Sequence, residues 1–309
     1  MKKIIISLFF GIFLAFSGVA FFLYNTSPVQ LVYMTDANYV PYVRVSLYSA
    51  IKNKHKSTKY DVHIIAENFT QEDSTSLKKM ASDDVKIIIH PTRELNLDLM
   101  HLGRFASFKI ALQKLFIAEY ITEDKVLYLD ADTLVQEDLS KVYNTPLRGF
   151  YVAAVKDGLM YQFPEHIKEI KLKWRNFYFN SGIMLLNLSK MRADNMMSRA
   201  IAYFNSHYEV FGDQDVLNVI VADKVKSLSY RYNCNSTFFE EKSAEFLSDF
   251  YNEKVPHTSR EVYENAAILH FAGHKPWTPY FTHTYLKPLW KSYEKETEQY
   301  LKSKNKTKK

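Results

Sequence analysis

Two carboxylates separated by one small residue are the part of this sequence with the clearest chemical potential. Asp130 and Asp132 flank Ala131 and directly follow the apolar run 126–129. Two carboxylates this close repel each other unless a cation or a proton offsets their charge. Oxygen ligands of this kind suit Mg²⁺ or Mn²⁺, and either ion can also neutralise the charge of a diphosphate. An ordinary acidic turn is the alternative, because this three-residue pattern is common by itself.

The elements around this pair predict an α/β domain with a mostly parallel sheet flanked by helices on both faces. Strand-like and helical stretches alternate along the chain, which is typical of such a sheet. The predicted strands are 31–35, 60–66, 85–90 and 125–129, and the predicted helices are 42–52, 71–81 and 105–121.

Polar segments that follow apolar strands are the places to look for a site. Ligands of open α/β sheets collect at the carboxyl ends of the strands, where loops and helix N-termini meet. Besides the carboxylate pair, the sequence offers the polar segments 35–39, 180–182 and 270–273.

Composition favours one large globular domain without disulfides. The chain has 309 residues, of which 47% are hydrophobic and 24% charged, and this excludes disordered and collagen-like classes. Its single cysteine, Cys234, excludes an intrachain disulfide and a structural zinc site built on thiolates. The basic residues gather at the C-terminus and do not alternate with aromatic residues, so we expect no nucleic-acid partner.

The N-terminus predicts a membrane anchor over residues 1–24, followed by a short spacer over 25–30. Lys2 and Lys3 precede an uncharged apolar run over 4–23, which would be about 30 Å long as a helix and would span a bilayer. A cleaved signal peptide is the alternative. The two lysines favour a cytoplasmic N-terminus, with the bulk of the chain on the far side.

The C-terminal residues 281–309 form a basic helix or tail in this interpretation. Its default role is a solvated tail, and attraction to anionic lipid is the alternative. For localisation we favour the bacterial inner membrane; a eukaryotic source would instead point to the Golgi membrane.

Four sequence segments add to the carboxylate pair. They are KVLYLDADTLV at 125–135, FYFNSGIMLLNL at 177–188, GDQDVLN at 212–218 and ILHFAGHKPW at 268–277. In this order they resemble glycosyltransferase family 8, the retaining family that includes bacterial lipopolysaccharide galactosyl- and glucosyltransferases and glycogenin. The resemblance covers residues 31–280 and implies a single GT-A-type catalytic domain that binds a nucleotide sugar.

The resemblance implies a metal site and a grip on the donor phosphates. Asp130, Asp132 and His270 would be the protein ligands of manganese, with magnesium as the alternative ion. Gly273 and Lys275 resemble the residues that hold the phosphates, for which a close backbone approach and a positive charge are suitable. The usual family spacing has one further residue between this glycine and this lysine.

The resemblance also implies UDP as the nucleotide of the donor. The segment with Thr35, Asp36, Asn38 and Tyr39 is similar to the one that reads uracil, where Asp36 would accept the base N3–H and Tyr39 would stack on the ring. Lys114 lies where many members carry an arginine that contacts the donor. Lysine keeps the positive charge but loses the planar fork of donors.

Further residues are assigned to the sugar by the same resemblance. Asp213 would bind donor hydroxyls and Gln214 would lie beneath the anomeric carbon. Asn180 would belong, with the following Ser-Gly, to the edge of the donor pocket. Asp157 is similar to a residue on the acceptor side.

These assignments together predict a retaining hexosyltransferase. It would move glucose or galactose from a UDP-hexose to a hydroxyl of a glycan acceptor, such as lipopolysaccharide or another surface glycan, beside a membrane. Because Gln214 is an amide and a poor nucleophile, attack by the acceptor on the front face is favoured over a double displacement.

Two other functions fit part of the sequence. Residues 129–135 also match the signature of haloacid-dehalogenase phosphatases, in which Asp130 would be the nucleophile and Asp132 the general acid. That motif normally lies on the first strand of its domain, whereas here about 100 residues of α/β pattern precede it. A sugar-nucleotide-binding protein without turnover is the second alternative.

Overall fold

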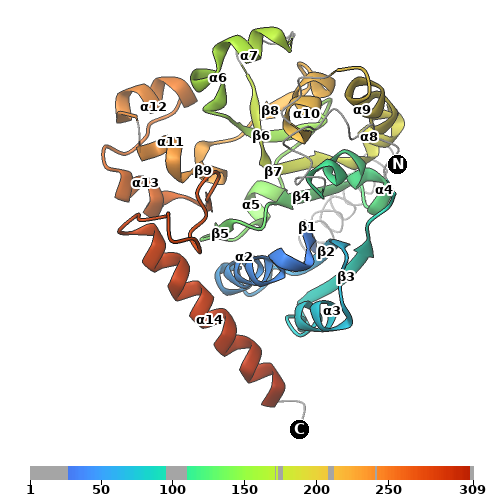
Figure 1. Ribbon diagram of the computed structural model, residues 1–309, viewed down its shortest axis with the longest axis vertical. Helices are drawn as coiled ribbons and strands as arrows, with labels where there is room; N and C mark the ends of the chain where they lie inside the picture. The colour runs from blue at the N-terminus through green and yellow to red at the C-terminus, as the bar shows by residue number, and fades with distance from the viewer. Residues whose placement is uncertain are drawn as a thin grey trace, which may run out of the picture.

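A seven-stranded sheet is the centre of the part of the chain that the computed structural model describes, namely residues 27–94, 110–170, 172, 177–207, 212–240 and 242–306 (Figure 1). Its strand order is β3-β2-β1-β4-β7-β6-β8. Strand β7 is antiparallel to β4 and to β6, and the other neighbours are parallel. The mostly parallel sheet predicted from the sequence is therefore confirmed. The strands are β1 (Val29–Asp36), β2 (Tyr60–Glu67), β3 (Val85–Pro91), β4 (Lys125–Leu129), β6 (Val152–Lys156), β7 (Phe179–Asn187) and β8 (Val225–Ser227).

Helices cover both faces of this sheet. Side chains alternate between the two faces along each strand, so strands that are apolar throughout present an apolar surface on both sides. In β1, Leu31 and Tyr33 belong to one buried apolar cluster, and Val32 and Met34 belong to the other. The first face packs against α2 (Val40–Asn53), α3 (Gln71–Lys78), α13 (Ser259–Asn265) and α14 (Leu286–Lys306). The second packs against α4 (Ile117–Tyr120), α8 (Leu188–Ala193), α9 (Met196–Phe204) and α10 (Asp213–Val221).

A three-stranded sheet, which the sequence pattern did not predict, lies beside the main one. Its order is β5-β10-β9, with β5 at Thr133–Val135, β9 at Cys234–Asn235 and β10 at Ile268–His270. In this sheet His270 pairs with Thr133 on one side and with Asn235 on the other. The small sheet thus brings the end of β10 next to the residues that follow β4.

Short elements complete the fold. They are η1 (Ala37–Tyr39), α5 (Ser140–Tyr143), α6 (Leu159–Gln162), α7 (Pro164–Glu169), η3 (Tyr230–Tyr232), α11 (Ser236–Glu240) and α12 (Ala244–Tyr251). The predicted helix 105–121 is described only from residue 110, where tight 3-10 turns over 110–116 lead into α4.

Of the helix or tail predicted for the C-terminus, residues 286–306 form the helix, and this helix packs on the domain instead of extending into solvent. Leu286 and Trp290 are fully buried, and Figure 1 shows α14 running beside α2. Two ion pairs, Arg44–Glu298 and Lys52–Glu296, join these two helices. The predicted anchor over 1–24 lies outside the described residues; within them, no helix combines the length and apolarity that a membrane span requires.

Buried His63 on β2 predicts a loss of stability in acid. It is 3% exposed, and its Nδ1 and Nε2 lie 2.9 Å from His90 Nε2 and 3.1 Å from Gln30 Oε1. Burial lowers the pKa of His63 to about 4, whereas the unfolded chain titrates near pH 6.5. The unfolded state therefore binds more protons between these values, and this part of the stability is lost as pH falls through that range. From pH 7.5 to pH 5 the loss is about 2 kcal/mol.

Urea unfolding at pH 7.5 and pH 5 measures this loss. The His63→Leu variant is expected to be less stable at pH 7.5, and its stability is expected to fall less with acid than that of the wild type. An identical acid-induced loss in both proteins would contradict the role of His63.

Candidate active site

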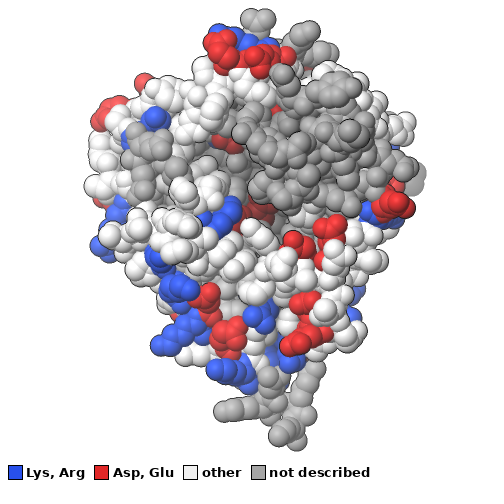
Figure 2. All heavy atoms as spheres, viewed as in Figure 1, with Lys and Arg blue, Asp and Glu red and all other residues white. Residues whose placement is uncertain are grey.

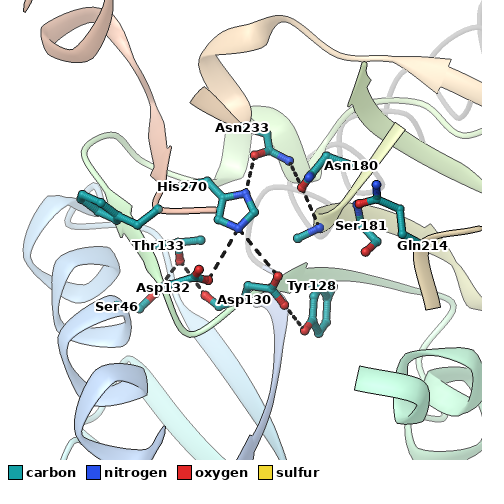
Figure 3. A network of polar contacts seen from close by, with 12 residues as sticks. Ser46, Tyr128, Asp130, Asp132, Thr133, Asn180, Ser181, Gln214, Asn233 and His270 are labelled. Atoms are coloured by element: carbon teal, nitrogen blue, oxygen red, sulfur yellow. Dashed lines mark hydrogen bonds and ion pairs between the residues drawn. The ribbon is translucent and has the colours of Figure 1, made fainter. Parts of the chain in front are cut away.

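Three side chains that can bind a metal ion meet where β4 and β10 end and β5 begins (Figure 3). Asp130 directly follows β4, Asp132 directly precedes β5, and His270 is the last residue of β10. His270 Nε2 lies 3.7 Å from Asp130 Oδ2 and 3.6 Å from Asp132 Oδ1. One ligand atom of each residue lies within 4.8 Å of those of the other two. The structure thus brings together the three residues predicted to hold a divalent cation.

Gly182 on β7 makes room for His270 and Asp130 because glycine has no side chain of its own. A Cβ atom at this position would lie 2.3 Å from His270 Cε1 and 2.9 Å from Asp130 Oδ2. The strand cannot easily withdraw, because Asp130 N donates a hydrogen bond to Gly182 O over 2.8 Å. Two carboxylates and an imidazole held this closely by backbone pairing fit a Mn²⁺ or Mg²⁺ ion, whose preferred ligands include carboxylate oxygens.

Two lysines offset the charge of the carboxylates. Lys275 Nζ donates a hydrogen bond to Asp132 Oδ2. Lys114, which is 7% exposed, lies 3.2 Å from Asp130 Oδ1 and 3.1 Å from Asp213 Oδ2. Burial alone would raise the pKa of Asp132, but the positive charge of Lys275 and its hydrogen bond outweigh burial and hold this pKa well below its usual range. For Lys114, burial alone would lower the pKa, but the negative charges of Asp130 and Asp213 outweigh burial, so its pKa is raised. The group therefore carries fixed charges of both signs.

A cavity of about 780 Å³ opens above this group. Figure 2 shows acidic and basic side chains meeting in a hollow near the centre of this face. Most of the predicted site residues line the cavity, namely Thr35, Asp36, Tyr39, Lys114, Asp130, Ala131, Asp132, Asn180, Asp213, Gln214, His270, Gly273 and Lys275. Its size and mixed lining suit a small polar ligand.

Two predicted site residues, Asn38 and Asp157, are not among the residues that line the cavity. Asn38 lies in the middle of η1 and is exposed. Asp157 is buried just behind the lining, where its Oδ2 accepts hydrogen bonds from Asn180 Nδ2 over 2.7 Å and from Gln214 Nε2 over 3.1 Å. Asp157 can therefore act on a ligand in the cavity through these two amides.

The rim of the cavity near β1 carries a group of aromatic rings. Asp36 Oδ1 accepts a hydrogen bond from Tyr39 N over 3.1 Å and so starts the turn that presents Tyr39. The Tyr39 ring is 39% exposed and meets the edge of Trp277 at 6.0 Å. Trp277 in turn stacks on Tyr42 at 3.6 Å. The sequence analysis gave Trp277 no role, although it is part of the motif at 268–277.

The opposite end of the cavity is formed where α10 begins. Gln214 Oε1 accepts from Ser181 N over 2.9 Å, and Asp213 Oδ2 accepts from Ser181 Oγ over 2.8 Å. Asp215, one residue further along, is fully buried, and its carboxylate binds Tyr178 and His166. Asp213 and Gln214 thus line the cavity, while Asp215 points into the protein.

Comparison with known proteins agrees with this geometry. The sequence model of Glycosyl transferase family 8 matches residues 30–280. A candidate glycosyltransferase of Haemophilus influenzae is 30% identical over 220 residues, which are 68% of this chain and 64% of that protein. The lipopolysaccharide 1,2-glucosyltransferase of Escherichia coli K12 is 28% identical over 260 residues, which cover 82% of this chain and 74% of that enzyme.

A solved structure shares the fold. The galactosyltransferase LgtC, solved with donor and acceptor sugar analogues, superimposes with a TM-score of 0.67 at 23% identity, and the match covers 87% of this chain and 96% of that one. This likeness establishes a GT-A-like α/β domain. With the family match over 30–280, it shows that the chain is a glycosyltransferase and belongs to Glycosyl transferase family 8.

Proposed function

We propose that this glycosyltransferase transfers a hexosyl group, glucose or galactose, from UDP to a hydroxyl of a surface glycan such as lipopolysaccharide, with retention of configuration. The observation that carries this proposal is the continuous cavity that joins the Asp130, Asp132 and His270 group to Asp213 and Gln214. A nucleotide sugar needs both ends, because its diphosphate seeks positive charge and its sugar seeks hydrogen-bonding partners. The E. coli relative is named as a lipopolysaccharide 1,2-glucosyltransferase, which supports a glycan of this class as the acceptor.

In this proposal the nucleotide occupies the end of the cavity near β1. Asp36 and the partly exposed Tyr39 ring would meet the uracil base, and Trp277 would hold that ring in place. Lys275 would lie near the diphosphate, since its ammonium group already lies at Asp132. A bound Mn²⁺ or Mg²⁺ ion would supply positive charge against the leaving diphosphate.

The sugar would then lie over Asp213 and Gln214. Retention through a double displacement would require a carboxylate on the far face of the sugar. Gln214 is an amide, Asp213 is engaged by Lys114 and Ser181, and Asp215 is buried away from the cavity. This arrangement favours attack by the acceptor hydroxyl on the front face, with the polar oxygen of Gln214 stabilising the positive charge that develops at the anomeric carbon.

We also propose that the acceptor is a lipid-linked glycan at a membrane. The apolar residues 4–23 would anchor the chain there, and the bacterial inner membrane is the location that fits a surface glycan.

Donor turnover with and without metal tests the proposed function. The purified full-length chain with Mn²⁺ is expected to release UDP from UDP-glucose or UDP-galactose, and faster with a lipooligosaccharide acceptor. EDTA is expected to abolish release and added Mn²⁺ to restore it, because Lys114 and Lys275 are already paired with carboxylates of the site and leave the diphosphate to be neutralised by the cation. Asp132→Asn is the matched control and is expected to stay inactive after Mn²⁺ is added.

Other results would replace the proposal. Release of phosphate from a simple phosphoester, without release of UDP, would support the phosphatase interpretation. Tight binding of UDP-hexose with no turnover under any of these conditions would support a binding protein.

A further inference from the structure

A series of hydrogen bonds runs from His270 in the cation group through Asn233 to Asn180, which lines the cavity (Figure 3). His270 Nδ1 and Asn233 Oδ1 lie 2.9 Å apart, and Asn233 Nδ2 donates to Asn180 Oδ1 over 2.9 Å. Asn233 is 2% exposed and His270 is 3% exposed. Water therefore cannot readily replace either partner, and the direction of each hydrogen bond is set inside the protein.

The direction of this series is fixed at Asn180. Its Oδ1 accepts from the backbone N–H of Gly182 over 2.9 Å, and its Nδ2 donates to the carboxylate of Asp157 over 2.7 Å. A backbone N–H can only donate, and an ionised carboxylate can only accept. Both partners thus require the same orientation of the Asn180 amide, with its oxygen toward Asn233.

That orientation determines the next two hydrogen bonds. Since Asn180 presents an oxygen, Asn233 must direct its amide nitrogen there and its oxygen toward His270. An amide oxygen accepts and cannot donate, so His270 Nδ1 must carry the proton. In a neutral imidazole the other nitrogen, Nε2, then has a free lone pair. This nitrogen is the one that faces Asp130 and Asp132 at 3.7 and 3.6 Å.

We propose that Asn233 is a positioning residue that holds His270 in the Nδ1–H tautomer, so that Nε2 is ready to bind the cation. The inference rests on the cation site of the proposed function and not on the sugar or the acceptor. Strand pairing supports it, because β9 pairs with β10 so that Asn235 lies opposite His270, and Asn233 comes two residues before Asn235. Partners of this kind orient a ligating histidine and raise its affinity for metal.

The tautomer can be measured directly in the metal-free protein. We expect ¹⁵N spectra of histidine-labelled protein at pH 8, with His270 assigned through His270→Gln, to show a protonated Nδ1 and an unprotonated Nε2. Asn233→Leu removes both hydrogen bonds and is expected to shift both ring nitrogens toward the average of the two tautomers. Asn233→Asp keeps an oxygen for Nδ1 and is expected to keep the wild-type tautomer.

Binding of Mn²⁺ alone, followed by calorimetry, gives the second readout. Asn233→Leu is expected to bind roughly 10- to 100-fold more weakly, and Asn233→Asp is expected to retain binding. The control is Asn218→Leu, which removes a buried asparagine whose amide forms hydrogen bonds with the backbone of Phe179 and Gln214. It is expected to lower stability but to leave the His270 spectrum and Mn²⁺ binding unchanged.

A wild-type His270 that carries its proton on Nε2 would overturn the proposal without any variant. Unchanged ring nitrogens and Mn²⁺ affinity in Asn233→Leu would overturn it as well, as would equal changes in Asn218→Leu. If no UDP-hexose is turned over but the spectra and Mn²⁺ binding follow the expected pattern, the proposed function fails and the role of Asn233 stands.

Discussion

Gly182→Ala is expected to remove nearly all transferase activity from a domain that still folds. The new methyl group would lie 2.3 Å from His270 Cε1, 2.8 Å from His270 Nε2 and 2.9 Å from Asp130 Oδ2, so these two ligands must move apart. A displacement of about 1 Å in a reacting group can lower the rate roughly 100-fold. The backbone of Gly182 is ordinary strand, which alanine adopts readily, so the loss should arise in the site. UDP release at saturating donor, together with the urea midpoint, measures both effects.

Gly149→Ala is the matched control for this change. A Cβ atom at Gly149 would meet nothing within 4 Å, although the residue has a φ of +77°. Alanine there should lower stability by about 1 kcal/mol because of its backbone conformation, and it should leave the rate of UDP release unchanged. Full activity in Gly182→Ala would show that Asp130 and His270 do not act together.

Lys114→Met is expected to reduce both stability and activity. The Lys114 side chain is 5% exposed and bridges Asp130 and Asp213, so its loss leaves two neighbouring carboxylates without their shared counter-charge. Removal of one partner from a buried ion pair typically costs about 3–5 kcal/mol. Lys114→Arg keeps the positive charge at the position where the resemblance places an arginine, and it is expected to retain most of the activity. Urea unfolding and UDP release separate the two effects.

A surface lysine provides the control for Lys114. Lys190 pairs with Asp194 at the protein surface, where such pairs contribute little, so Lys190→Met should change neither stability nor UDP release measurably. A Lys114→Met protein as stable as the wild type would contradict the inferred charge balance of the site.

The main sheet could be predicted from the sequence because its strands are long enough to show a pattern. Strand β4 begins and ends where expected, at Lys125 and Leu129, and β1 and β2 differ from their predicted bounds by one or two residues. The small sheet could not be predicted in this way, because strands of two or three residues have no measurable periodicity. The pattern marked 270–273 as a polar segment, but the role of His270 as a metal ligand came from the family resemblance.

The role of Asn233 and the packing of α14 on the domain were missed for different reasons. The role of Asn233 depends on the pairing of β9 with β10, a contact between distant segments that no local pattern reveals. In α14 a signal was present but was outweighed by the charges: Leu286, Trp290, Tyr293 and Leu301 recur at helical spacing, and all four are buried. The lysines between them suggested a tail, although lysines on the outer side of a packed helix give the same composition.

The packing of α14 indicates that this helix folds together with the segment that carries Lys275. Trp290 is fully buried, with its ring 5.3 Å from Phe271 and 5.1 Å from Trp277. These two partners flank Lys275 in the segment that follows His270. The family match stops at residue 280, so a boundary drawn there would cut away the support beneath the loop that carries Lys275. The last helix thus supports the loop that carries Lys275, although none of its residues is among the described residues that line the cavity.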